Sequence, residues 1–187
     1  KNNNFTIIKK EKKIGPGDSF NKGFNWILSH STNDDDIVIT MEADNTSDIS
    51  ILMEMISISK LGYDIVLASV YAQGGGFSKT SFTRKIISFF ANLLFRSIFN
   101  IKVLTLSSFY RVYKISILRK IKQYFSIIIA EKGFISMLEI LLKSVKLNAR
   151  VIEVPMILKS DIRKGKSKMK IFKNSISYVH FFLKYKK

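Results

Sequence analysis

The stretch Ile37-Val-Ile-Thr-Met-Glu-Ala-Asp-Asn-Thr-Ser-Asp48 decides the fold, because an apolar segment runs directly into a group of carboxylates. Its first part predicts a buried strand, and Glu42, Asp44 and Asp48 follow that strand closely. In open α/β sheets, metals and phosphorylated ligands bind beyond the carboxyl ends of the strands. The three acids therefore predict a functional site at one edge of a sheet.

Glu42 and Asp44 are the candidate metal ligands of this site. Mg²⁺ and Mn²⁺ prefer carboxylate oxygens and share their remaining positions with substrate phosphates. Asp44 is the first candidate ligand and Glu42 the second, whereas Asp48 is better placed to cap the following helix. The sequence leaves an alternative open, in which Asp48 is a cap and the other two are solvated loop acids.

Strand and helix patterns alternate along the chain, which predicts an α/β fold with a mostly parallel sheet flanked by helices. Asp18 is placed to cap the first helix, and Pro155 predicts that the last strand lies at an edge or ends its pairing there. Strands are predicted at residues 5–10, 37–41, 64–69, 107–113 and 150–158, and helices at residues 18–31, 49–61, 79–99 and 134–147.

Composition narrows the class of protein. The chain has 187 residues, enough for one domain, and 47% are apolar, which excludes a disordered segment. It has no cysteine, which excludes a disulfide framework and a zinc–thiolate site. The net charge of +17 predicts an anionic partner, namely nucleic acid, anionic lipid or a phosphorylated substrate, unless it reflects a general lysine-rich bias.

Basic residues gather in the segment Arg163-Lys-Gly-Lys-Ser-Lys-Met169, where Arg163, Ser167 and Lys168 are candidates to surround a phosphate. The alternative is a basic surface loop. Few aromatic residues interleave with these cations, so nucleic acid is a less favoured partner. The glycine-rich segment 74–77 precedes Arg84 and is able to fold over a bound anion, or is an ordinary loop.

Two further charged residues are candidates. Glu139 lies in an apolar helical stretch, where a carboxylate needs a partner or must face a cleft. Arg111 follows Ser107-Ser-Phe-Tyr110 and is either functional or an outward-facing residue of a strand. The tail 171–187 mixes apolar residues with lysine; it is too short and charged to span a bilayer, and either lies at a membrane interface or packs on the sheet.

Taken in order, these segments resemble the family 2 glycosyltransferases, in the dolichol-phosphate mannosyltransferase-like branch that loads a sugar onto polyprenyl phosphate. The resemblance covers about residues 14–169. It is carried by Gly15-Pro-Gly17, Ile37-Val-Ile-Thr-Met-Glu-Ala-Asp44, Asp64-Ile-Val-Leu-Ala-Ser69, Gly74-Gly75, Arg84-Lys-Ile-Ile-Ser88, Ser107-Ser-Phe-Tyr-Arg111, Glu139, Arg150-Val-Ile-Glu-Val-Pro155 and Arg163 to Lys168.

The resemblance implies a GT-A-like fold that binds a nucleotide-diphosphate sugar. It implies a metal motif at Glu42-Ala-Asp44 holding Mg²⁺ or Mn²⁺, and inverting transfer to a dolichyl or undecaprenyl phosphate at the cytoplasmic face of a membrane, which the enzyme contacts peripherally. It implies catalytic roles for Asp44, Arg111 and Glu139, and phosphate contacts for Arg84, Arg163, Ser167 and Lys168.

The chain also departs from the pattern of this family. The family opens with a nucleotide-binding strand and turn that do not occur here, so we expect residues 1–168 to form an N-terminally truncated catalytic domain without its first strands. Residues 169–187 are then a basic amphipathic helix. Glu42 replaces an aspartate, and Thr105-Leu-Ser-Ser-Phe109 lacks an acid and a glycine of the family. Two alternatives remain: a degenerate, inactive homologue of this family, and a basic module that binds anionic lipid or nucleic acid.

Overall fold

The structure is a computed structural model, and it describes residues 5–162 together with Phe181 and Tyr185. Two 3-10 turns at Ile49–Ile51 and Ser160–Ile162 accompany its helices and strands. In chain order these are α1 Pro16–His30, β1 Ile37–Thr40, α2 Leu52–Lys60, β2 Ile65–Ser69, β3 Gly76–Ser78, α3 Phe82–Phe99, β4 Arg111–Lys114, α4 Ile115–Phe125, α5 Ser136–Lys146, β5 Val151–Pro155 and β6 Ile157–Lys159.

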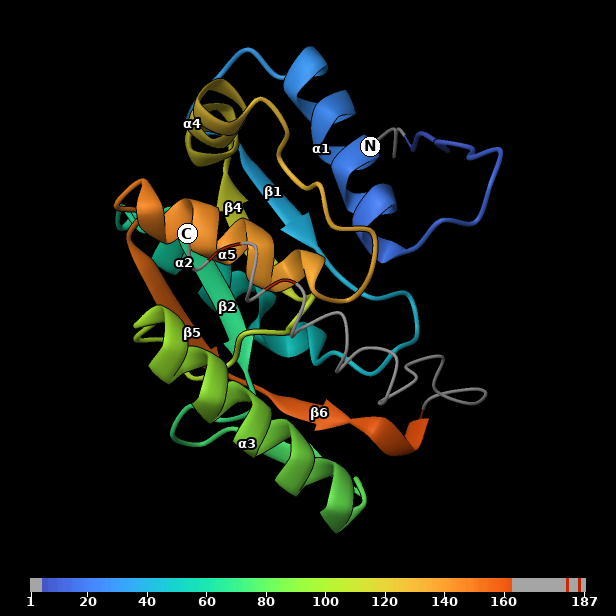
Figure 1. Cartoon of the computed structure of the whole chain (residues 1–187), viewed down its shortest axis with the longest axis vertical. Coiled ribbons are helices and arrows are strands. Elements are labelled where there is room, and N and C mark those ends of the chain that lie inside the picture. The colour runs from blue at the N-terminus through green and yellow to red at the C-terminus, as the bar shows by residue number, and fades with distance from the viewer. Residues whose placement is uncertain (1–4, 163–180, 182–184, 186–187) are drawn as a thin grey trace.

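A four-stranded sheet in the order β1-β4-β2-β5 forms the centre of the fold (Figure 1). β1, β2 and β5 share one direction, and β2 pairs with β5 in parallel. β4 lies between β1 and β2 and runs antiparallel to both. The α/β class is therefore confirmed, but the sheet is mixed rather than mostly parallel. Residue patterning could not reveal this, because apolar alternation is the same for both strand directions.

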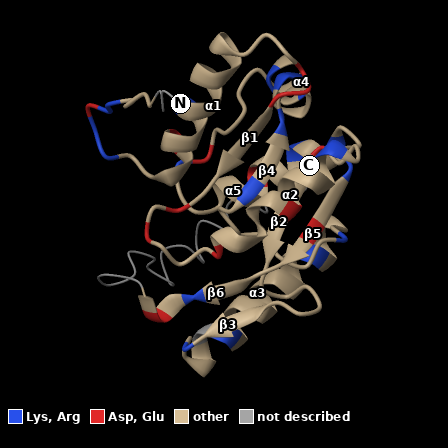
Figure 2. Cartoon of the chain, turned by 180° about the vertical axis from the view of Figure 1, so that it is seen from behind, with Lys and Arg blue, Asp and Glu red and all other residues tan. Residues whose placement is uncertain are grey.

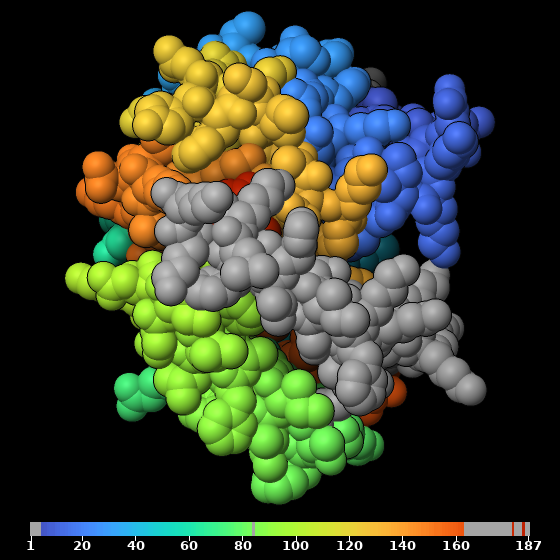
Figure 3. All heavy atoms as spheres, viewed as in Figure 1, coloured from blue at the N-terminus to red at the C-terminus, as the bar shows by residue number. Residues whose placement is uncertain are grey.

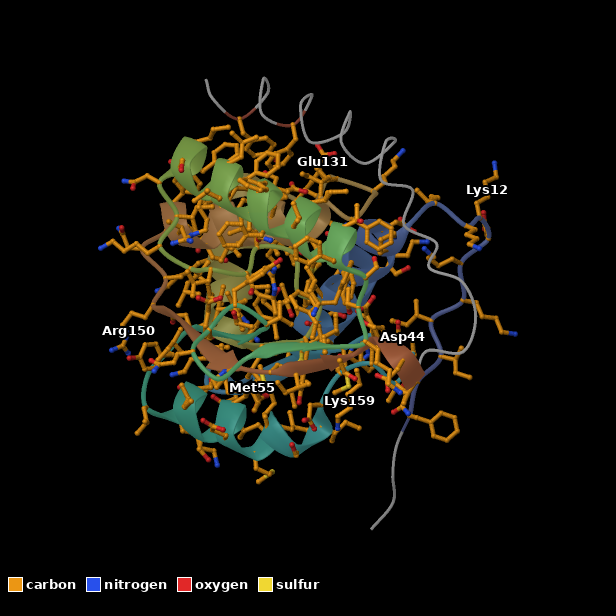
Figure 4. The ribbon with its side chains drawn as sticks, turned by 90° about the horizontal axis from the view of Figure 1, so that it is seen from below. Lys12, Asp44, Met55, Glu131, Arg150 and Lys159 are labelled. Carbon is orange, nitrogen blue, oxygen red and sulfur yellow. The ribbon has the colours of Figure 1, made fainter. Side chains whose placement is uncertain are left out.

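Helices cover both faces of the sheet. Leu67 packs with α1, α4 and α5 on one face, and its neighbours Val66 and Ala68 pack against α2 on the other. Figure 4 shows α2 (teal) and α3 (green) on opposite sides of the sheet. Because β2 is buried on both faces, every one of its residues is shielded from water, as expected for a central strand.

The N-terminal segment differs from the prediction. Residues 5–10 form no strand; Lys10 instead ties this segment to α1, with its Nζ 2.9 Å from Asp18 Oδ2 and 3.3 Å from the Gly15 carbonyl oxygen. The expected cap at Asp18 is also wrong, because Gly15 is the N-cap residue. Pro16 starts the helix earlier, since its fixed φ suits the first helical position, and Asp18 lies in the first turn.

Other local predictions are confirmed. Asp48 caps the turn that leads into α2, with its Oδ1 accepting a hydrogen bond from the Ser50 amide at 3.2 Å. Pro155 ends β5, which is an edge strand of the sheet. Helix α4 was not predicted from sequence, although Ile117, Leu118 and Ile121 give it a buried face.

The predicted C-terminal helix and the boundary near residue 168 lie almost wholly outside the described residues. Phe181 and Tyr185 are the exceptions: Phe181 is buried and packs against Phe99 of α3. Within the described part of the chain, none of the helices is long and apolar enough to cross a membrane.

Candidate functional site

A cavity of about 140 Å³ lies at the edge of the sheet where β1, β2 and β5 end. Because β4 runs the other way, the loop that precedes it reaches the same edge. The walls are therefore formed by Ala68 of β2 and by residues that flank all four strands, and they include Glu42, Ser47, Tyr71, Ser88, Thr105 and Tyr110. Small-molecule pockets are usually about 300–1,000 Å³, so this cavity accommodates a sugar or phosphate group rather than a whole nucleotide sugar.

The loop after β1 brings its acids to this edge, and Figure 2 shows acidic positions along it. Glu42 lines the cavity. Asp44 is half-buried, and its Oδ1 accepts hydrogen bonds from the Thr46 amide at 3.2 Å and the Thr46 hydroxyl at 2.7 Å, which fix the direction of the carboxylate. The structure thus holds the two predicted metal ligands in one short, folded loop beside the cavity.

Lys159 of β6 joins this loop, although sequence reasoning missed it. Its amide donates to the Thr46 carbonyl at 2.9 Å, and its Nζ lies 3.5 Å from Asp48 Oδ1. The hydrogen bond from the Ser50 side chain is the main cause that lowers the pKa of Asp48, and the charge of Lys159 acts in the same direction.

The carboxylates of this loop suit a divalent cation only if a substrate supplies further ligands. Across residues 5–162 with Phe181 and Tyr185, no three or more His, Cys, Asp or Glu side chains gather as a metal site. Mg²⁺, however, is commonly held by one or two carboxylates together with substrate phosphates. Glu42 and Asp44 match that smaller requirement, so a site for Mg²⁺ or Mn²⁺ there stays a prediction.

Two tyrosines at the cavity were also missed from the sequence. The Tyr110 side chain is 1% exposed, and its hydroxyl has no hydrogen-bond partner among the described residues. Burial raises the pKa of Tyr110, and the charge of Asp48 raises it further. Burial also raises the pKa of Tyr71, against the opposing effect of Ser88 and Asn92. Both phenols therefore remain protonated at neutral pH and are able to donate to a bound oxygen atom.

Three polar side chains hold the backbone of the cavity loop at residues 104–110. Glu153 of β5 accepts from the amides of Leu104 at 2.7 Å and Thr105 at 2.8 Å. Asn92 of α3 accepts from the Leu106 amide at 2.9 Å. The loop is consequently fastened both to the edge strand of the sheet and to α3.

Arg111 is the third of these side chains, and the alternative in which it is an outward-facing residue of a strand is wrong. It is fully buried and donates to backbone carbonyls of Ser108 at 2.7 Å, Leu106 at 2.8 Å and Met137 at 2.9 Å. It can be buried because these carbonyls satisfy its charged donors. Arg111 does not line the cavity. It holds the backbone of the cavity loop through its bonds to the Ser108 and Leu106 carbonyls.

Thr105 stands where the resembling family carries an acid, and it forms an uncharged contact instead. Its hydroxyl lies 2.7 Å from the Ser69 hydroxyl, and both residues are buried. The Ser69 hydroxyl also accepts from the Tyr71 and Ala72 amides, at 3.3 and 3.0 Å. The pair thus joins the cavity loop to the end of β2 without adding a charge to the cavity.

The carboxylate of Glu139 was expected either to have a bonding partner or to face a cleft, and the structure shows that it has partners. It is fully buried, and its oxygens accept from the amides of Ala130 at 3.0 Å and Glu131 at 2.8 Å, from Lys143 Nζ at 2.7 Å and from the Tyr185 hydroxyl at 3.0 Å. Burial, and then the charge of Glu139, raise the pKa of Tyr185. Glu139 does not line the cavity and anchors the loop before α5 instead.

The remaining predicted phosphate contacts are only partly placed. Arg84 lies on α3, but its side chain is outside the described part of the structure. Arg163, Ser167 and Lys168 also lie outside the described residues. Their roles stay predictions.

Comparison with known proteins yields relatives of low identity. No family model matches the chain. A polyprenol monophosphomannose synthase of Mycolicibacterium smegmatis is 23% identical over 163 residues, which cover 87% of this chain and 59% of the relative. An undecaprenyl-phosphate mannosyltransferase of Micrococcus luteus is 25% identical over 163 residues, covering 87% of this chain and 64% of the relative.

These relatives support the resemblance to polyprenyl-phosphate glycosyltransferases. The mixed α/β sheet with flanking helices is compatible with a GT-A-like fold. The chain spans less than two thirds of the length of either relative.

Proposed function

We propose that this protein transfers a sugar from a nucleotide-sugar donor to a polyprenyl phosphate. The observation that carries the proposal is the meeting of Glu42, which follows β1, with wall residues that flank β2, β4 and β5 at one edge of the sheet. That is the edge at which open α/β sheets bind phosphorylated ligands. The names of both relatives support a polyprenyl-phosphate acceptor and make mannose the first candidate sugar.

In the proposed reaction, an ionised oxygen of the acceptor phosphate attacks the anomeric carbon of the donor sugar. The bond from that carbon to the diphosphate oxygen breaks, and the nucleoside diphosphate leaves with the electron pair. A single displacement inverts the anomeric configuration. The attacking oxygen already carries charge near neutral pH, so no general base is needed; positioning and charge neutralisation carry the catalysis.

The residues of the cavity have separate tasks in this scheme. Glu42 and Asp44 would hold Mg²⁺ or Mn²⁺ together with the donor diphosphate, and the cation would supply charge neutralisation for the leaving group. Tyr110 and Tyr71 donate hydrogen bonds to oxygens of the bound groups. Arg111 keeps the cavity loop in place, and Arg84, Arg163, Ser167 and Lys168 are proposed phosphate contacts.

The acceptor is a membrane lipid, so the proposed reaction takes place at a membrane surface, which we place at the cytoplasmic face. An anionic membrane surface suits a chain of net charge +17. Nucleic acid is not a proposed partner, because few aromatic residues interleave with the basic residues of the segment 163–169.

A transfer assay tests the proposal. The protein is incubated with radiolabelled nucleotide sugars, mannose donors included, and with undecaprenyl phosphate in detergent, with and without Mn²⁺. We expect label in the lipid fraction and release of nucleoside diphosphate, both abolished by Asp44→Asn and unaffected by Asp35→Asn, a matched change in an exposed loop. An inactive homologue would transfer no label from any donor. A protein that only binds lipid would bind undecaprenyl phosphate but would neither label it nor release nucleoside diphosphate.

A further inference from the structure

Helix α3 is held to the rest of the protein by a small number of its side chains. Among its described side chains, only Asn92 and Phe95 are buried, and the others are half-buried or exposed. Asn92 accepts the hydrogen bond from the Leu106 amide of the cavity loop, and Ser88 of the same helix lines the cavity. The position of α3 therefore determines where one wall of the cavity lies.

Two residues near the end of the chain, Phe181 and Tyr185, form a C-terminal clasp between α3 and α5. The rings of Phe99 of α3 and Phe181 meet edge to face, with their centroids 6.1 Å apart. The rings of Phe181 and Tyr185 stack with their centroids 4.2 Å apart. The Tyr185 hydroxyl then donates a hydrogen bond to Glu139 Oε1 of α5 at 3.0 Å. Figure 3 shows α3 (green) and α5 (orange) on the same face of the molecule.

The contacts of the C-terminal clasp are of strong kinds. Phe181 is 1% exposed and belongs to the larger hydrophobic core of the protein, and edge-to-face aromatic contacts add to the stabilisation that burial gives. The Tyr185 hydroxyl bonds to a carboxylate, and hydrogen bonds to charged groups are stronger than neutral ones. The carboxylate of Glu139 is itself held by two backbone amides and by Lys143. The clasp therefore attaches the end of α3 to a fixed point of the fold.

We propose that Phe181 and Tyr185 are positioning residues for the cavity, because they fix the end of the helix that carries Ser88 and Asn92. An α-helix rises about 1.5 Å per residue, so Ser88 lies roughly 16 Å along α3 from Phe99. A tilt of roughly 10° about that end would move Ser88 by roughly 3 Å, which is enough to separate a hydrogen-bonded pair at the cavity. The effect on transfer rests on the proposed function, whereas the placement of α3 does not.

Amide hydrogen exchange, measured by NMR on the full chain without any ligand, tests the placement of α3. Tyr185→Phe keeps the stacked ring and removes only the hydroxyl, whereas Phe181→Ala removes the ring contacts as well. The Leu106 amide reports on α3, because its acceptor is the Asn92 side chain. We expect this amide to exchange about threefold faster or more in Tyr185→Phe, and about tenfold faster or more in Phe181→Ala, because α3 opens more often without the clasp.

Neighbouring amides separate a local release of α3 from a general loss of stability. The Leu104 and Thr105 amides belong to the same loop but bond to Glu153 of β5, and the Ala68 amide lies in the central strand β2. Local release predicts that the exchange of the Leu106 amide increases at least about threefold more than that of these three amides. As the matched control, Tyr124→Phe removes a hydroxyl from a residue of α4 that is 74% exposed, and it should change none of these rates.

Transfer kinetics give a second measurement. A displaced cavity wall should raise the KM for the nucleotide sugar by about threefold or more in Tyr185→Phe, and Tyr124→Phe should leave it unchanged. A smaller folded fraction would lower the apparent kcat without changing KM, so the KM separates positioning from a purely structural role. Circular dichroism confirms folding of each variant; should Phe181→Ala not fold, Tyr185→Phe alone decides.

The inference is overturned if the Leu106 amide exchanges at the wild-type rate in Tyr185→Phe, or if it speeds up only in step with the Ala68 amide. It fails separately from the proposed function. Unchanged exchange in a variant that transfers sugar normally would refute the role of the clasp and leave the transferase intact. Faster exchange at Leu106 alone, in a protein that transfers no sugar, would support the clasp and refute the transferase.

Discussion

Replacing Glu139 by its neutral amide should destabilise the protein strongly. In the structure the carboxylate lies 2.7 Å from Lys143 Nζ, and the two side chains are 0% and 6% exposed. Glu139→Gln leaves the lysine charge buried with the Ile127 and Ile128 carbonyls as its partners, at 2.8 and 3.2 Å. It also turns an amide nitrogen toward backbone N–H donors. Breaking a buried pair in this way costs about 3–5 kcal/mol, out of a total stability of about 5–15 kcal/mol.

Urea unfolding at neutral pH, followed by circular dichroism, measures this loss. Lys143→Met removes the other member of the pair, and the double variant tests whether the two act together. We expect the double variant to lose less than the sum of the single losses, with a coupling of about 1–3 kcal/mol. The reasoning is refuted if Glu139→Gln unfolds at the wild-type urea concentration. Normal stability with lost transfer would instead assign Glu139 the catalytic role that the family resemblance implies.

Three smaller changes test other parts of the structure. In Gly17→Ala the new Cβ would clash with the Glu131 carbonyl oxygen, so urea unfolding should show a loss of about 2 kcal/mol or more. Gly23→Ala, with nothing within 4 Å of the new Cβ, should instead stabilise α1 by up to about 1 kcal/mol. Arg111→Met removes the charged donors to three buried carbonyls and should cost about 3 kcal/mol or more while reducing transfer, with Arg119→Met on α4 as the milder control. Asp48→Ala should cost about 1 kcal/mol at neutral pH, and Asp48→Asn much less. Because the pKa of Asp48 is lowered, its contribution is present above the ordinary aspartate pKa and is lost as pH falls through the lowered value, so the Asp48→Ala deficit should shrink in acid.

Strand and helix positions could largely be predicted from sequence, because local patterns determine them. The apolar run at Ile65 to Ser69 predicts a central strand, and Asp48 followed by Ser50 predicts a capped turn before α2. Strand direction could not be predicted in the same way. The reversal of β4 depends on where the chain crosses the sheet between α3 and α4, which is a property of the tertiary fold.

In the candidate site too, some features could be predicted from local sequence and others depend on the tertiary fold. Glu42 and Asp44 follow a strand and are found at its end, beside the cavity. Glu139 was singled out as a carboxylate in an apolar segment and Arg111 as a charge on a predicted strand, and only the structure reveals that both are buried and bound by backbone groups. Tyr110 and Lys159 carried no signal in the sequence, because their proximity to the acidic loop arises from the pairing of distant segments.

The central claim is that Glu42 and Asp44 bind a donor diphosphate through a shared divalent cation. Calorimetric titration of the protein with a panel of nucleotide sugars, in Mn²⁺ and again in EDTA, tests it most directly. We predict that binding is detectable in Mn²⁺, is lost in EDTA, and is lost in Asp44→Asn under both conditions. Equal affinity with and without the metal would contradict the account.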